Sequence, residues 1–100
     1  MADSQFTLYR GAASATSATL FTSPSSVSIG VSEIIITNTT TSSATATVNL
    51  GSIALVSSIS IAANTTEFIE LNQILFNGET ITASASTTGV NFHIAGYEVY

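Results

Sequence analysis

The sequence predicts an all-β protein: a single antiparallel β-sandwich, jelly-roll-like, that forms one domain over residues 1–100. Apolar and polar residues alternate with a period of two wherever a period can be read, which is typical of strands with one packed face. Turn-forming residues recur at the short spacing of a sandwich. Threonine is abundant, and its branched β-carbon suits a strand. A chain of 100 residues can bury one core, so we expect one domain.

Six segments show the alternation expected of strands. In chain order they are Phe6 and Leu8; Val27, Ile29 and Val31; residues 44–50, with Ala44, Ala46, Val48 and Leu50 on one face; Ile59 and Ile61; Ile81, Ala83 and Ala85; and Val90, Phe92 and Ile94. A single helical turn around residues 71–75 is the one competing helical interpretation. These segments predict several short strands.

Turn signals separate the expected strands. They are Ser23-Pro24-Ser25, residues 38–43, Ala63-Asn64, Asn77-Gly78 and Thr87-Thr88-Gly89. Asn77-Gly78 is the sharpest, because both residues tolerate the positive φ of a tight hairpin, and we predict that it joins two strands. The Ser/Thr-rich stretch 37–43 is predicted to be a hairpin loop. The sequons that begin at Asn38 and Asn64 are interpreted as turns, since the chain shows no secretory signal.

The composition excludes several classes of function. Only 7% of residues are charged and about a third are Ser or Thr, so we expect a hydroxyl-rich surface. Arg10 is the single Lys or Arg and the net charge is −5, so the protein cannot neutralise a row of phosphates, and we expect no binding to nucleic acid. No cysteine is present, which excludes disulfide and thiolate chemistry.

The apolar content does not indicate a membrane protein. The longest strongly apolar run, residues 53–56, is far shorter than the roughly 20 residues of a membrane-spanning helix. The first residues are polar and lack the basic and apolar regions of a signal peptide, so we expect synthesis in the cytoplasm.

Residues that could carry catalysis are few, and we expect no enzyme activity. His93 is the only histidine and lies between Phe92 and Ile94, on the opposite face of the expected strand, without a second candidate that must face it. Glu67 and Glu70 are three residues apart and therefore lie on opposite faces of a strand. A metal site is not expected either, because its candidates are too few and scattered: Asn77, Glu79 and Asp3. No glycine pattern of a phosphate loop is present, and we expect no cofactor.

Three segments break the alternation and indicate surfaces covered on both sides: residues 34–36, 53–56 and 74–76. The second cover is either a loop of the same domain or another subunit, and the latter predicts a homo-oligomer. Tyrosines supply further candidates, either as a sugar-stacking or protein-contact surface or as the rim of the sandwich. The predicted interface residues are Tyr9, Arg10, Ile34, Ile35, Ile36, Tyr97 and Tyr100.

The chain resembles the small β-sandwich proteins of tailed bacteriophage virions over nearly its full length. The resemblance rests on the stretches "SATSATLFTSP", "VSEIIITNTTTSSATATVNL", "SIAANTTEFIEL", "ILFNGETITASAST" and "VNFHIAGYEV". In that group an "L..GD.I.A.AS" hairpin follows the third stretch. The residues that match it here are Leu75, Gly78, Ile81, Ala83, Ala85 and Ser86, and Glu79, after Asn77-Gly78, stands where Asp is commoner.

The resemblance implies a capsid decoration (cement) protein that binds the major capsid protein and is localised in the virion. It also implies a trimer, which would sit at local three-fold positions of an icosahedral shell. A neck, tail or fibre-associated adaptor, or a receptor- or glycan-binding module with clustered exposed aromatics, is the alternative. The predicted attachment uses apolar packing, backbone pairing and Arg10, so salt should weaken it only partly.

Overall fold

The computed structural model describes residues 3–24, 28–51, 53–76 and 78–99, with only the backbone for residues 3–6 and 99. Eight strands follow one another: β1 (Asp3–Ala12), β2 (Ala18–Thr22), β3 (Ser28–Asn38), β4 (Ala44–Leu50), β5 (Ile53–Ile61), β6 (Thr65–Leu75), β7 (Thr80–Ala85) and β8 (Val90–Val99). Among the residues described, no helix has the length and apolarity needed to cross a membrane.

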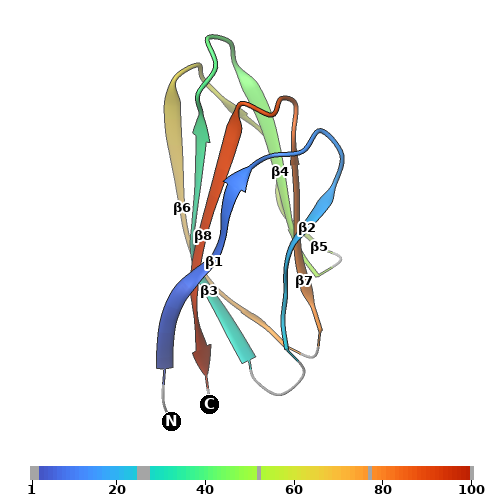
Figure 1. Cartoon of the computed structure of the whole chain (residues 1–100), viewed down its shortest axis with the longest axis vertical. Helices are drawn as coiled ribbons and strands as arrows, with labels where there is room; N and C mark the ends of the chain where they lie inside the picture. Colours follow the sequence, from blue (N-terminus) through green and yellow to red (C-terminus); the bar gives the residue numbers. More distant parts are fainter. Residues whose placement is uncertain (1–2, 25–27, 52, 77, 100) are drawn as a thin grey trace.

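The strands form two four-stranded antiparallel sheets that pack face to face (Figure 1). Sheet A has the order β1-β8-β3-β6 and sheet B the order β2-β7-β4-β5. The first strand pairs with the eighth, the second with the seventh, the third with the sixth and the fourth with the fifth. Antiparallel pairing of this nested kind, split between two sheets, is a jelly roll. The prediction of an all-β antiparallel sandwich is confirmed.

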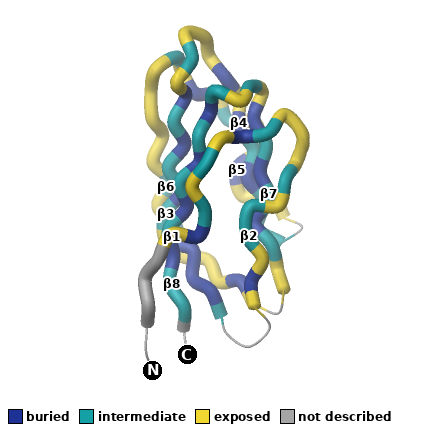
Figure 2. Tube along the Cα trace, in the orientation of Figure 1, coloured by how far each residue is buried: buried dark blue, intermediate teal, exposed yellow. Residues whose placement is uncertain are grey.

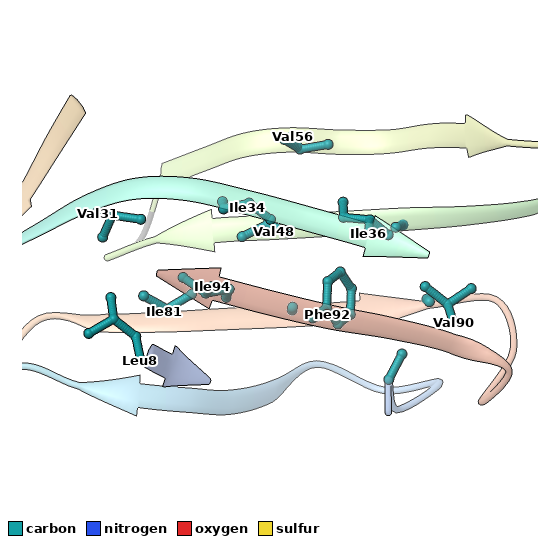
Figure 3. Packing of buried hydrophobic residues seen from close by; sticks show 14 of the residues in the cluster. Leu8, Val31, Ile34, Ile36, Val48, Val56, Ile81, Val90, Phe92 and Ile94 are labelled. Atoms are coloured by element: carbon teal, nitrogen blue, oxygen red, sulfur yellow. The ribbon is translucent and has the colours of Figure 1, made fainter. Parts of the chain in front are cut away.

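The core lies between the two sheets and is built from the alternating apolar residues. Ile34 and Ile36 of sheet A, with Phe92 and Ile94, point toward sheet B, and Val48 and Ile81 face them (Figure 3). The polar residues that alternate with the buried ones along the strands, such as Thr45 of β4, point to the outer faces. Exposed positions lie there and in the loops (Figure 2). Period-two alternation therefore located the inner faces of these strands correctly.

The connections differ from the expected hairpins. Residues 39–43 lead from β3 in sheet A to β4 in sheet B, so the Ser/Thr-rich stretch crosses between sheets and is not a hairpin loop. The connection from β6 to β7 also changes sheets, and there Gly78 has the expected positive φ of 82°, while Asn77 lies outside the described residues. Residues 71–75 belong to β6, not to a helical turn.

Among the described strands, β4 and β5 are the one consecutive pair that forms a hairpin. Leu50 pairs with Ile53, and Gly51 at the turn has φ of 63°, which glycine adopts at little cost. The physical reason for the wrong hairpins is the jelly roll itself, which places most consecutive strands in different sheets. Turn residues mark where the chain bends, but they do not say which sheet it enters next.

Candidate functional site

The edge strands β5 and β6 define the side of the sandwich where the candidate site lies. Each ends its own sheet, β5 in sheet B and β6 in sheet A, and each pairs with one neighbouring strand. The short connection 62–64 joins them at one end, which we call the closed end. The opposite end, around the start of β5 and the finish of β6, is called the open end.

The closed end is held by Asn38, whose side chain is completely buried. Its amide nitrogen donates to the carbonyl oxygens of Ser42 (2.8 Å), Ile61 (3.0 Å) and Ala62 (3.3 Å). Its Oδ1 accepts from the backbone N–H (2.9 Å) and the hydroxyl (2.7 Å) of Thr40. Among the described residues no buried side-chain nitrogen or oxygen lacks a partner. A satisfied buried amide of this kind fixes one arrangement of the segments it joins.

Threonines extend this network to neighbouring loops. The hydroxyl of Thr39 donates to the carbonyl of Gly89 (2.7 Å), which ties the β3–β4 connection to the start of β8. The backbone N–H of Asn64 donates to the carbonyl of Thr40 (3.1 Å), and the hydroxyl of Thr65 donates to the carbonyl of Ala62 (2.7 Å). The threonines around the Asn38 sequon therefore have a structural role at this end.

The open end forms an apolar groove of about 260 Å³ between β5 and β6. The residues that line it are Leu50, Ile53, Ala54, Leu55, Gln73, Ile74, Leu75 and Glu79, and we call it the β5/β6 groove. Ile53 is 72% exposed, Ile74 44% and the adjacent Phe76 50%. In the same two segments, Val56 and Leu75 are buried in the core. Two of the three segments that break the alternation therefore meet at one surface.

Glu79 places a carboxylate at this groove. Its Oε1 accepts a hydrogen bond from the backbone N–H of Phe76 (3.2 Å). Its Oε2 lies 3.2 Å from where a β-carbon on Gly51 would stand, so the hairpin turn leaves room for the carboxylate. The single Lys or Arg of the protein, Arg10, lies on β1, at the far edge of sheet A from β6.

The outer face of sheet A is the second candidate surface. Strand register places Arg10, His93, Ile35 and Phe68 in one row across its four strands. The Nε of Arg10 donates to Nδ1 of His93 (3.2 Å), a contact that requires the neutral ring with its proton on Nε2. Phe68 is 65% exposed. A shallow hollow of about 200 Å³ beside this row includes Glu33.

The predicted interface residues do not form one surface. Ile34 and Ile36 are fully buried in the domain's own core, so the prediction that they contact a neighbour is wrong. The alternation of β3 turns only Ile35 outward, where it is half-buried. Arg10 is exposed on the same face. Tyr100 lies outside the described residues.

The two described tyrosines of the predicted interface serve the domain itself. Tyr9 packs against the core, and its hydroxyl donates to the carbonyl of Ala12 (3.3 Å). The ring of Tyr97 occupies the space over Gly30, where a β-carbon would lie 2.2 Å from a ring atom. Its hydroxyl donates to Oδ1 of Asn72 (3.1 Å), so the ring spans from β8 across β3 to β6.

The groove was not among the predicted interface residues, although its signal was present. The apolar runs 53–56 and 74–76 predicted strands that are covered on both faces, but nothing in the sequence indicated that the two runs lie side by side. The groove forms because strand pairing places β5 and β6 at the neighbouring edges of the two sheets. Within the described part of the chain, no group of three or more His, Cys, Asp or Glu side chains is placed to hold a metal ion.

Comparisons with known proteins identify the fold. No protein-family model matches the sequence, and no curated protein matches it. A chain in the crystal structure of the T13 IBDV viral particle is similar in structure, with a TM-score of 0.67 and 11% identity, over 99% of this chain and 31% of that one. A chain of the infectious bursal disease virus Gx strain gives a TM-score of 0.48 and 14% identity, over 97% and 30%. The protein thus spans 31% of the first neighbour's chain and shares its fold across that part.

Proposed function

We propose that the protein is a structural component of a virus particle, specifically a decoration (cement) protein that binds the outside of the shell of a tailed bacteriophage. The observation that carries this proposal is the fold: the entire jelly roll matches part of a chain from an icosahedral viral particle. The phage assignment and the position on the shell rest on the sequence resemblance described above.

The surface chemistry supports a role in assembly over a role in catalysis. Exposed apolar side chains gather at the β5/β6 groove and, on a smaller scale, around Phe68 on the outer face of sheet A. His93 is engaged by Arg10, and the carboxylates of Glu67 and Glu70 lie on an exposed edge strand. We therefore propose a protein that acts through contacts and not through a chemical step.

The aromatic residues favour a shell-binding role over glycan binding. A sugar-stacking platform needs exposed rings near one another, often with a polar group at the edge. Tyr9 and Tyr97 are instead packed against this protein's own residues. The described rings with the greatest exposure, Phe68 and Phe76, lie on the outer face of sheet A and at the open end.

We propose that the protein is a homo-oligomer, a trimer by resemblance, and that the outer face of sheet A contributes the contact. This face carries Ile35 and Phe68 together with groups of both signs, Arg10 on β1 and Glu70 on β6. Copies related by rotation could pair these charges, which a face of one sign could not do.

Sedimentation tests the proposed function directly. Purified protein is mixed with particles of its virus that lack it, and the pellet is assayed after centrifugation through sucrose. We expect saturable binding in a fixed ratio to the shell subunit, and light scattering of the free protein should give a mass above that of one chain. Failure to bind particles, together with absence of the protein from mature virions by mass spectrometry, would contradict the proposal.

A further inference from the structure

The β5/β6 groove gathers apolar side chains that the domain itself leaves exposed. Ile53 and Ile74 line it and Phe76 follows the lining residue Leu75, and none of the three is among the buried core residues. Contiguous exposed apolar patches on small proteins mark contact surfaces, whereas isolated exposed apolar residues need no explanation. The convergence of two separate segments at this place indicates a contact surface.

The backbone beside the groove is also available for pairing. Strands β5 and β6 are both edge strands, and neither contains Lys, Arg or Pro, which commonly protect edges from another chain. β5 bulges at Ser58, with φ of 50°, and its pairing with β4 shifts again at Leu55, while the pairing of β6 with β3 shifts at residues 71–72. The regular edge beside the groove is therefore short, residues 53–54 of β5 and 73–75 of β6. A short extended segment could add to the β6 stretch as a strand, with backbone hydrogen bonds and alternate side chains in the groove.

The charges around the β5/β6 groove indicate which kind of partner could bind in it. Glu79 lines the groove, Glu67 and Glu70 lie on β6, and the single Arg is at the opposite edge of sheet A. A second copy joined groove to groove would bring carboxylates together without any Lys or Arg to offset them. A partner segment with a basic side chain would complement Glu79, whose position is fixed by the Phe76 N–H.

We propose that the β5/β6 groove binds an extended segment of another virion protein, apolar at alternate positions and bearing a Lys or Arg side chain that pairs with Glu79. The inference rests on the proposed function, since it names the surface and the partner chemistry through which the protein attaches to the shell.

Paired variants test the groove in the sedimentation experiment. The double variant Ile53→Thr/Ile74→Thr keeps β-branched residues in both strands but removes apolar surface from the groove. Thr45→Ser removes a methyl group from an exposed side chain of β4 on the outer face of sheet B, away from the groove and from the outer face of sheet A, and serves as the control. We expect the double variant to bind particles about tenfold more weakly or worse, and the control to bind within about twofold of wild type.

The charge is tested by Glu79→Gln, which retains an oxygen for the Phe76 N–H, against Glu67→Gln, an exposed carboxylate toward the closed end of β6, as the matched control. We expect Glu79→Gln alone to weaken attachment at low salt, with the difference from wild type shrinking as salt is raised. A photo-reactive amino acid at position 53, irradiated on the particle, should crosslink to a shell-protein peptide that contains Lys or Arg.

The outcomes separate the two proposals. Wild-type protein that ignores particles would overturn the proposed function and this inference with it. Wild-type protein that binds particles while the groove variants bind equally well, or while position 53 crosslinks to a second copy of the chain, would overturn the inference and leave the proposed function standing.

Discussion

The closed and open ends of the β5–β6 side are built from the same two strands, yet they differ in chemistry. At the closed end the buried Asn38 amide contacts three carbonyls, one backbone N–H and one hydroxyl at 2.7–3.3 Å, so its polar atoms are satisfied within the chain. At the open end Ile53, Ile74 and Phe76 remain exposed. The chain therefore satisfies its own polar groups at one end and leaves apolar side chains in water at the other.

On this one pair of strands, we expect the residues of the closed end to affect stability and those of the open end to affect binding. Hydrogen bonds to a buried group affect the free energy of unfolding, because each broken bond leaves a desolvated partner. Side chains that are already in water in the free protein contribute little to folding but can contribute to association. Substitutions at the two ends should therefore produce opposite patterns of effect.

Asn38→Ala should give the largest loss of stability. The substitution removes five contacts at hydrogen-bond distance and leaves the buried carbonyl of Ile61 without this donor. We expect the free energy of unfolding to fall by roughly 3 kcal/mol or more, measured by urea denaturation. A loss below about 1 kcal/mol would show that the closed end is not held by this amide.

Thr40→Val should have an intermediate effect. The shape of the side chain is nearly retained, but the hydroxyl near Asn38 Oδ1 and the Ser42 carbonyl is lost, while the Thr40 N–H still reaches Asn38. We expect a loss of about 1–2 kcal/mol in the same assay. Thr45→Val, at an exposed position of β4, is the control and should change stability by less than about 0.5 kcal/mol. Equal effects of the two variants would contradict the role of the network.

Ile53→Thr at the open end should have the smallest effect on stability. The side chain is 72% exposed, and threonine also suits a strand. We expect a change in the free energy of unfolding below about 0.5 kcal/mol, while binding to particles decreases. A loss of stability comparable to that of Asn38→Ala would mean that Ile53 is part of the core of the folded protein and not a contact residue.

The alternation of residues predicted the inner faces, because a period of two is a local property of an extended chain. It placed Phe92 and Ile94 inside and His93 outside, as observed. It could not predict which strands pair, since the jelly roll pairs the first with the eighth. The hairpin was therefore assigned to Asn77-Gly78, while the turn after Leu50 was missed although Gly51-Ser52 separates two apolar strands.

Because the sequence does not show which strands pair, it also did not show which apolar residues lie at a surface. Ile34 and Ile36 looked like excess apolar residues, but they belong to the core face of a central strand. The runs 53–56 and 74–76 carried a comparable signal, and their outward residues became a groove only because β5 and β6 are the edges on one side. The role of Asn38 was hidden as well, since a buried asparagine and a turn asparagine look alike in sequence.

Hydrogen–deuterium exchange on the free and particle-bound protein tests most directly whether the open end is the attachment surface. Peptides that cover residues 53–56 and 73–76 should exchange at least about tenfold more slowly on the particle, because a docked strand would pair with free edge amides. Peptides that cover residues 38–43 and 61–65 should exchange at the same rate in both states. Slower exchange at the closed end without any change at the open end would contradict the account.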